Sequence, residues 1–247
     1  MRIVAIILMF LLLLVPFTLD SYATIENIYE LIGLKILKPN PTICIMEPDE
    51  TMQSKFWEVG FIDKIISTSQ EWVITMNKQG GNWDFNYEFH YWNDHKYKAP
   101  SDYKQCNVFI LFDNDYRGNE LGYTSFNYSN SNHKYAIITI HTEFPVKFTD
   151  IGEYGNTIIH NVELELCVIE KTMLHEFGHI LGLGHYQNPY EKKSIMTPFL
   201  NHKVCNDHRI ITQIDIDMLI MIYGNDGFEI KDNPVILDKK IKIEQNL

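Results

Sequence analysis

The feature that most constrains this chain is an eleven-residue segment, His175–His185, with the sequence HEFGHILGLGH. Its first two histidines, His175 and His179, are four residues apart, so on a helix both imidazoles leave the same face one turn apart. Two neutral ring nitrogens in that arrangement can bind one zinc ion at about 2.0–2.1 Å. The spacing therefore predicts a helix that carries the first two ligands of a zinc site.

The other fixed positions of the segment suit the same site. Glu176 is rotated about 100° from His175 around the helix, so its carboxylate can approach a metal-bound water without ligating the metal. Gly182 lets the backbone leave the helix in a conformation closed to residues with a Cβ, and His185 can then return as a third ligand. Three protein ligands leave a fourth position for water, which is typical of a catalytic zinc and not of a structural one.

An isolated HExxH pattern is a modest signal, because such a helix can also be ordinary core. Five fixed positions at this spacing arise by chance at a rate on the order of 10⁻⁴ or less in a chain of this length. Eleven residues after His185, the segment Ser194–Pro198 places Met196 near a proline. On its own this methionine would be a loop core residue, but methionine is unbranched and can pack beneath three imidazoles. We expect a tight turn below the metal site.

Residues 1–23 have the pattern of a secretory signal peptide. Arg2 precedes the unbroken apolar run Ile3–Val15, and small residues stand before a cut after Ala23. The alternative is an uncleaved membrane anchor, since Phe17 and Leu19 extend the apolar stretch. The shortness of the run favours cleavage and a secreted, extracellular chain over a cell-surface protein held by the N-terminal segment.

Four cysteines lie in the mature part of the chain. An even number of cysteines outside the cytoplasm favours two disulfides, and four allow three pairings among which the sequence does not choose. A zinc or redox site of the CxxC type is excluded, because no two of them are close enough in the sequence. The four are Cys44, Cys106, Cys167 and Cys205.

Composition narrows the class of protein. The 247 residues are 45% hydrophobic and 21% charged, which is ordinary for a globular protein and argues against disorder. A formal net charge of −11 gives no support to binding a nucleic-acid backbone. We see no boundary inside residues 42–224, so we expect one catalytic domain there, after a linker at 24–41 and before a tail at 225–247.

Hydrophobic periodicity and turn residues predict the order of the elements. Between Phe144 and Asn161 we expect a long polar connection, and the linker could form a helix at Ile25–Leu37. Thr212 and Asp215 resemble a capping box at the start of the last helix. The expected strands are Thr42–Glu47, Phe85–Tyr91, Val108–Phe112, Leu121–Tyr128 and Tyr135–Thr142, and the expected helices are Met52–Met76, Val162–Leu181 and Gln213–Tyr223.

The zinc motif together with Met196 resembles the metzincin clan of zinc endopeptidases, in which a methionine-containing turn, the Met-turn, lies beneath the site. Pro198 and the segment Thr212–Ile216, leading to Tyr223-Gly224, resemble the matrixins, the group that includes the matrix metalloproteinases. The resemblance implies an α+β fold of metzincin type. Its parts would be a five-stranded mixed twisted sheet, a long N-terminal helix, an active-site helix, the Met-turn and a C-terminal helix.

The same resemblance implies a function and the residues that perform it. Together with the signal-like segment, it describes a monomeric, secreted, zinc-dependent endopeptidase that hydrolyses peptide bonds of protein or peptide substrates through one metal-activated water, with Glu176 as the general base. The strand containing Gly122, Tyr123 and Thr124 would be the edge that pairs with an extended substrate. Phe199 would help to wall the pocket for the side chain after the cut, which implies an apolar preference there.

The resemblance also bears on the cysteines and on further metals. It makes the first strand a neighbour of the third, which implies a Cys44–Cys106 disulfide and leaves Cys167–Cys205.

No cysteine-switch propeptide is recognisable, and Tyr186 stands where matrixins usually have serine. A second, structural zinc loop is not recognisable either, so we interpret His133 and His141 as surface or structural residues. Calcium is an option at one acidic loop, against a solvated loop without metal; its residues are Asp113, Asn114, Asp115 and Glu120.

Three other hypotheses belong to different classes of protein. A secreted zinc-binding protein without turnover would not need Glu176. A structural or adhesion module at the cell surface would need Ile3–Val15 to remain as a tether. An intracellular peptidase is contradicted by the signal-like segment.

Overall fold

A computed structural model describes residues 29–31, 40–50, 60–96, 98–113, 120–127, 135–149, 157–186, 193–198 and 209–224. The expected signal segment 1–23 and the tail 225–247 lie outside these residues, as does most of the linker. Within the described part of the chain, no helix is both long enough and apolar enough to cross a bilayer.

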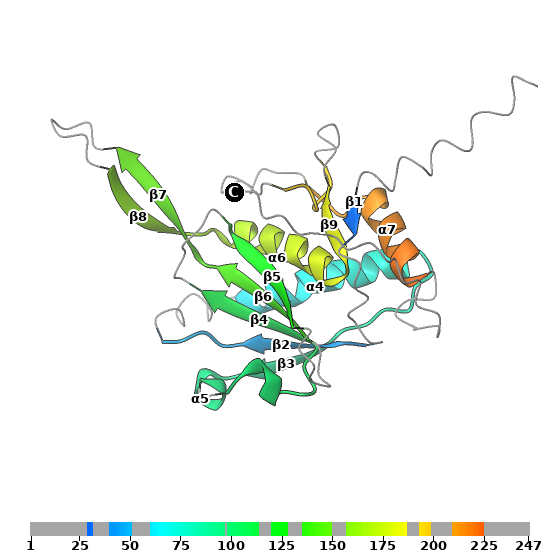
Figure 1. Cartoon of the computed structure of the whole chain (residues 1–247), viewed down its shortest axis with the longest axis horizontal. Helices are drawn as coiled ribbons and strands as arrows, with labels where there is room; N and C mark the ends of the chain where they lie inside the picture. The colour runs from blue at the N-terminus through cyan, green and yellow to red at the C-terminus, as the bar shows by residue number, and fades with distance from the viewer. Residues whose placement is uncertain are drawn as a thin grey trace, which may run out of the picture.

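A five-stranded mixed sheet forms the centre of the fold, in the order β3-β2-β4-β6-β5 (Figure 1). The first four of these strands run parallel, and β5 is antiparallel to β6 at the edge. The prediction of a mixed sheet with the first strand beside the third is therefore confirmed. The strands are β2 (Thr42–Met46), β3 (Asn86–His90), β4 (Val108–Asp113), β5 (Gly122–Asn127) and β6 (Tyr135–His141).

The burial of each strand follows from its residues. β4 and β6 are buried along most of their length, as expected for apolar strands in the interior of a sheet that is covered on both faces. β5 alternates between half-buried and exposed side chains. Its inner residues, Gly122 and Thr124, therefore face the neighbouring helix, and its outer residues, Tyr123 and Ser125, face solvent.

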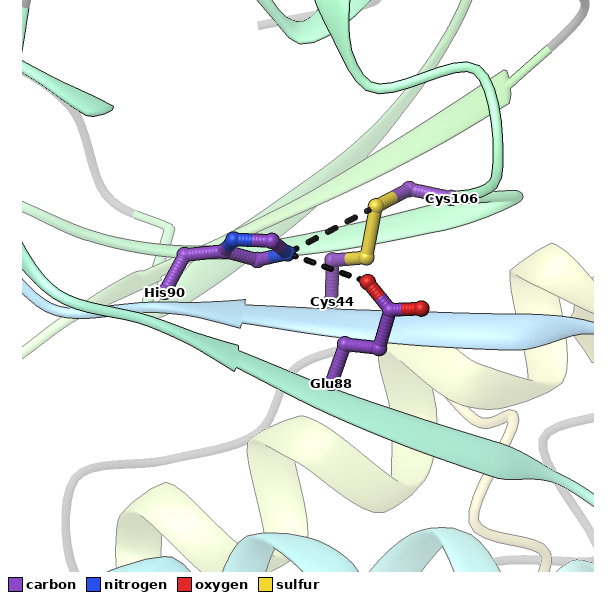
Figure 2. A group of neighbouring side chains, drawn as sticks. All are labelled: Cys44, Glu88, His90 and Cys106. Carbon is purple, nitrogen blue, oxygen red and sulfur yellow. Dashed lines mark hydrogen bonds and ion pairs between the residues drawn. A yellow bond between two sulfur atoms is a disulfide. The ribbon is translucent and has the colours of Figure 1, made fainter. Parts of the chain in front are cut away.

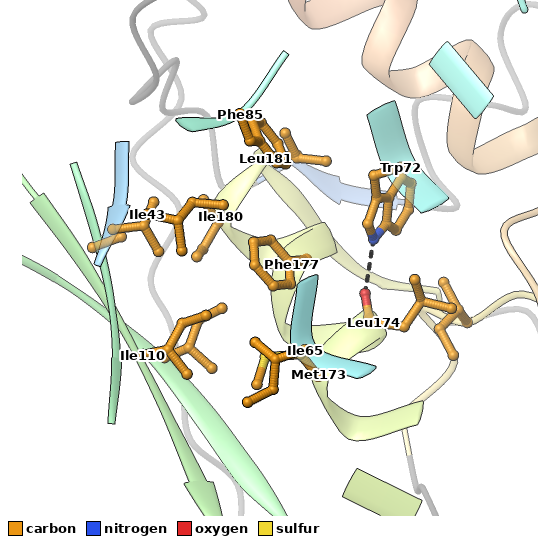
Figure 3. Packing of buried hydrophobic residues seen from close by; sticks show 14 of the residues in the cluster. Ile43, Ile65, Trp72, Phe85, Ile110, Met173, Leu174, Phe177, Ile180 and Leu181 are labelled. Carbon is orange, nitrogen blue, oxygen red and sulfur yellow. Dashed lines mark hydrogen bonds between the residues drawn. The ribbon is translucent and has the colours of Figure 1, made fainter. Parts of the chain in front are cut away.

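Two helices, α4 (Phe61–Asn77) and α6 (Leu166–Ile180), pack on one face of the sheet and enclose the main core (Figure 3). The Trp72 side chain is fully buried, and its Nε1–H donates to the Leu174 carbonyl at 2.9 Å. This contact between α4 and α6 helps to fix the position of α6. Helix α4 was expected to begin near Met52, but it begins at Phe61, because the preceding Gly60 has a φ of +84°, which is not helical. Residues 51–59 lie outside the described residues.

The last helix, α7 (Gln213–Tyr223), has the predicted bounds. The backbone N–H of Thr212 donates to Asp215 Oδ2 at 2.7 Å, so the predicted cap is present. Gly224 has a φ of +75° and ends the helix, because residues with a Cβ rarely adopt this conformation. The two shorter helices are α5 (Trp92–His95) and η1 (Pro100–Asp102).

The expected polar connection at Phe144–Asn161 is wrong. Its two ends form an antiparallel pair, β7 (Glu143–Thr149) and β8 (Thr157–Glu163), which projects from the body of the molecule (Figure 1). Pro145 lies within β7, opposite Asn161 of β8, and proline is tolerated in an edge strand where its nitrogen faces away from the partner. Because β8 extends to Glu163, α6 begins at Leu166 instead of Val162.

The expected helix at Ile25–Leu37 is wrong for residues 29–31. These form β1 (Tyr29–Leu31), which pairs antiparallel with β9 (Leu183–Tyr186) directly after the active-site helix. A short apolar stretch is ambiguous between helix and strand, and here the partner lies 150 residues or so away in the sequence. β1 therefore braces the strand that carries His185.

The opposite face of the sheet carries a smaller core, whose members are Cys44, Met46, Tyr103, Cys106, Phe109 and Tyr135. Cys44 and Cys106 form a disulfide in this core, which is the pairing that the resemblance implies. Cys167 is also disulfide-bonded, and its expected partner Cys205 lies outside the described residues.

Candidate metal centre

α6 and the chain that follows it bring three histidines together. His175 and His179 lie one turn apart on α6, which ends at Ile180. Gly182 follows with a φ of +99°, in the left-handed region that favours glycine, and turns the chain into β9. His185 then lies opposite the two helical histidines, as the spacing predicts.

The Nε2 atoms of these histidines converge on one point. His175 Nε2 lies 3.0 Å from His179 Nε2 and 3.2 Å from His185 Nε2. Two nitrogens bound to one zinc at about 2.0–2.1 Å with tetrahedral angles lie roughly 3.3 Å apart. The separations therefore suit a shared zinc ion.

The other ring nitrogens fix which atom faces the centre. His175 Nδ1 donates to the Ile195 carbonyl at 2.7 Å, and His179 Nδ1 donates to the Leu183 carbonyl at 2.8 Å. A carbonyl can only accept, so in the neutral imidazoles the proton is on Nδ1 and the lone pair of Nε2 points inward. Lone pairs at these separations repel one another unless a cation lies between them, which is the chemical reason that this set of donors fits a metal.

Burial keeps the two helical histidines in the neutral form that binds metal. Burial, with His179 alongside, holds the pKa of His175 well below its ordinary value. Burial, with His185 alongside, lowers the pKa of His179 to about 4. Neutral imidazole is the ligand form, so protons compete weakly with a metal at these positions.

Glu176 lies on the same helix, buried beside the edge strand β5. Thr124 Oγ1 donates to Glu176 Oε2 at 2.7 Å and also lies 3.2 Å from the Glu176 carbonyl oxygen. Burial raises the pKa of Glu176 to about 8, against the opposing effect of the Thr124 hydrogen bond. A cation at the histidines would favour the carboxylate form, and a buried carboxylate beside a metal is suited to accept a proton.

The predicted turn at Ser194–Pro198 lies against the active-site helix. Its residue Ile195 provides the carbonyl that orients His175, and Met196 is fully buried. A Cβ at Gly178 would collide with the Met196 sulfur, so the thioether fills the space that this glycine leaves on α6. Pro198 is half-buried at the end of the turn.

Asp215 supports the turn beneath the histidines, a role that the local sequence around it does not reveal. It is fully buried, and its Oδ1 accepts a hydrogen bond from Ser194 Oγ at 2.7 Å. Ser194 Oγ in turn accepts from the Met196 N–H at 3.0 Å. The aspartate that caps α7 thus also holds the Met-turn, and only its capping role was visible in the local sequence.

We expect Asp215→Ala to lower the free energy of unfolding by about 3 kcal/mol, because Ser194 and the Thr212 N–H would lose a buried, charge-assisted acceptor. Urea denaturation followed by circular dichroism measures this change. Asp217→Ala on the same helix is the matched control, since among the described residues the Asp217 carboxylate accepts an exposed hydrogen bond from Gln213. Equal effects of the two substitutions would contradict the role of Asp215.

The residues expected to bind substrate do not all lie on the same side of β5. Tyr123 is 42% exposed on the outer side of β5, and Thr124 points inward to Glu176. Gly122 lies against β6 and α6, where a Cβ would come within 2.9 Å of the Thr139 carbonyl oxygen and the Thr172 side chain. Gly122 therefore permits close packing of the edge strand, and Phe199 lies outside the described residues.

The residues considered for further metals are placed as follows. His141 is buried, as expected for a structural residue, and its ring lies 6.0 Å from that of Tyr123. Among the described residues, Asp113 and Glu120 belong to no group of three metal donors, so calcium at this loop gains no support. His133, Asn114 and Asp115 lie outside the described residues.

Comparisons with known proteins bear on the family. No curated protein matches the chain. Among solved structures, archaemetzincin from Methanopyrus kandleri is similar with 12% sequence identity and a TM-score of 0.41, over 74% of this chain and 94% of that chain. The matrixin family model matches residues 70–224, which include the sheet strands from β3 on, the three histidines and the Met-turn. With more than half of its length matched, the chain belongs to the matrixin family of zinc-dependent peptidases.

Proposed function

We propose that this matrixin is a secreted, monomeric endopeptidase in which Glu176 is the general base. The observation that carries the proposal is the convergence of three histidine Nε2 atoms beside a buried carboxylate that is held against the edge strand of the sheet. His175, His179 and His185 would hold zinc. When bound there, zinc supplies a Lewis acid that polarises water and the peptide carbonyl.

The residues around the histidines suit peptide-bond hydrolysis. Glu176 takes a proton from the attacking water and returns it to the leaving amine, the two roles of one carboxyl group in general acid–base catalysis. Burial of Glu176 excludes competing water from its carboxylate. The hydrogen bond from Thr124 keeps the carboxylate oriented through both transfers.

The substrate would bind in an extended form along β5. Among the strands that the structure describes, β5 lies at the edge of the sheet beside β6, and an edge strand is where an extended peptide can add. Tyr123 and Ser125 point outward from it, where they can contact substrate side chains. Pro198 ends the Met-turn on the way to Phe199, and we place the pocket for the side chain after the cut there, with an apolar preference.

Secretion is part of the proposal. Residues 1–23 have the pattern of a signal peptide, and the Cys44–Cys106 disulfide suits an oxidising compartment. N-terminal sequencing of the exported chain distinguishes the two possible fates of this segment. A new terminus at Thr24 supports secretion, whereas a terminus at Met1 on a membrane-bound chain supports anchoring.

A cleavage-site profile tests the proposed activity most directly. The purified chain is incubated with a proteome-derived peptide library, without chelator, with a zinc chelator, and after zinc is added back. We expect internal cuts with an apolar preference after the scissile bond, lost with chelator and restored by zinc. Release of terminal residues alone, or cutting that the chelator leaves unchanged, would contradict an endopeptidase of this mechanism.

Thr124→Val is expected to lower kcat at least tenfold with little change in KM, because it removes one charge-assisted hydrogen bond to Glu176 while keeping the shape of the side chain. Steady-state kinetics on a fluorogenic peptide, at equal zinc content, measure the effect. Thr124→Ser retains the hydroxyl and should keep most of the activity. If the serine and valine variants lose equal activity, Thr124 does not act through its hydroxyl.

A further inference from the structure

A second group of metal-binding side chains lies on the face of the sheet opposite α4 and α6 (Figure 2). Cys44 on β2 is the register partner of Glu88 on β3, and His90 follows Glu88 on the same side of that strand. Cys106 lies two residues before β4, the other neighbour of β2. The strand order therefore gathers four donor residues from β2, β3 and the segment that leads into β4.

The donor atoms in this group are close to one another. One atom from each of Cys44, Glu88, His90 and Cys106 lies within 4.8 Å of the others. His90 Nε2 is 3.4 Å from Glu88 Oε2 and 3.9 Å from Cys106 Sγ. In Figure 2 the His90 ring points toward both the disulfide and the Glu88 carboxylate.

The solvent exposure of the side chains increases across the group, from the two cysteines to Glu88. Both cysteines are fully buried, the His90 side chain is 16% exposed and the Glu88 side chain is 41% exposed. A small ion can therefore enter from the Glu88 side, whereas the sulfurs are shielded from solvent by the smaller core. The T-shaped packing of Tyr103 against His90, with ring centroids 4.7 Å apart, holds the imidazole in place.

We propose that reduction of the Cys44–Cys106 disulfide converts this group into a second zinc site, with the two cysteine sulfurs, His90 Nε2 and a Glu88 oxygen as its four ligands. Two sulfurs, one imidazole and one carboxylate form a set that zinc binds tetrahedrally. The site is distinct from the three histidines, which lie on the other side of the sheet. It does not depend on the proposed peptidase activity.

The oxidised and reduced states differ in their chemistry. The sulfurs of a disulfide carry no negative charge, so the oxidised group offers zinc only His90 and Glu88. A small-molecule dithiol can reduce the bond: the dithiol gives up two electrons and becomes its own disulfide, and its two protons pass to Cys44 and Cys106. Zinc then displaces these two protons and forms two bonds to sulfur.

The consequence concerns the central sheet. In the oxidised chain the disulfide links β2 to the start of β4. In the reduced chain, zinc would link the same two segments and add β3 through Glu88 and His90. The fold of this half of the sheet would then be held by a covalent bond under oxidising conditions and by a metal under reducing ones.

Cobalt titration of the full mature chain tests the proposal, since cobalt bound to thiolate has a sulfur-to-metal charge-transfer absorption that three histidines cannot produce. The chain carries Cys167→Ala and Cys205→Ala, so that Cys44 and Cys106 are its only thiols. Metal is counted after gel filtration, and circular dichroism of the same samples reports the fold. We expect one cobalt per oxidised chain, and two per reduced chain with the thiolate absorption.

Two substitutions distinguish the proposed site from adventitious binding to thiols. His90→Ala should weaken the second cobalt at least tenfold, and Glu88→Gln should weaken it measurably, whereas Glu71→Gln, at an exposed position on α4, should not. A reduced chain that binds no more cobalt than the oxidised chain, or whose cobalt lacks the thiolate absorption, would overturn the proposal, folded or not. So would thiolate-bound cobalt that His90→Ala leaves unchanged, or that appears only in a chain without secondary structure.

Discussion

Glu176→Gln is expected to lower kcat/KM by about 10³-fold while the chain keeps its zinc. General acid–base catalysis by one side chain contributes typically 10²–10⁴-fold, and an amide cannot take a proton from water. The amide oxygen of glutamine can still accept the hydrogen bond from Thr124, so the local structure should remain. Peptide cleavage and zinc content, measured on the same preparation, test both halves of this expectation.

Glu170→Gln provides the matched control for this substitution. Glu170 lies on the same helix, six residues before Glu176, and within the described residues its carboxylate forms a partly exposed ion pair with Lys64 at 3.2 Å. Activity within twofold of the parent is expected. If Glu176→Gln retained comparable activity, another group would have to be the base, and the proposed mechanism would be wrong.

His179→Ala has the second large expected effect, which is loss of zinc and, with it, of activity. Structural zinc sites bind with apparent free energies of about 10–16 kcal/mol, so removal of one of three protein ligands should weaken binding by roughly 10²-fold or more. It would also leave His175 Nε2 without its partner at 3.0 Å. Competition with a chromophoric chelator measures the zinc dissociation constant of each variant.

His141→Asn is the control for loss of a buried histidine. His141 lies on β6 outside the group of three, so this variant should retain one zinc per chain even if its stability falls. Full zinc occupancy in His179→Ala would show that the metal is held elsewhere.

The parts of the site that a local spacing encodes were predictable from the sequence. His175, His179 and Gly182 lie within one helix and its end, where the 3.6-residue repeat and the need for a positive φ leave few alternatives. The cap of α7 by Asp215 is likewise a relation between residues three apart. The apolar strands β4 and β6 were recognisable because buried parallel strands are continuous apolar runs.

The parts that depend on contacts between distant segments were not predictable in the same way. The hydrogen bond of Thr124 to Glu176 was not foreseen, because alternation along β5 does not say which face meets α6. The bond between Ser194 and Asp215 joins a loop to a helix 21 residues later. β1 becomes a strand only because β9 offers it an edge, and nothing near residues 29–31 in the sequence reveals this.

The Cys44–Cys106 disulfide lies between these two cases, because the sequence limited its possible pairings without choosing among them. Cys44 and Cys106 are separated by 62 residues, so counting cysteines left three pairings open and only the strand order of a known fold singled out this one. Spacing along the chain also excluded a CxxC-type metal site and said nothing of Glu88 and His90. Their approach follows from the register of β2 with β3, which is a property of the folded sheet.

X-ray absorption at the zinc edge of the zinc-loaded, oxidised chain tests the central claim most directly. The account predicts one zinc per chain, with three imidazole nitrogens at about 2.0–2.1 Å and one further, non-protein ligand. The same spectrum of His179→Ala, if any zinc remains, should show fewer imidazoles. Sulfur among the ligands of the oxidised chain, or a shell closed by four protein ligands, would contradict a catalytic centre built from His175, His179 and His185.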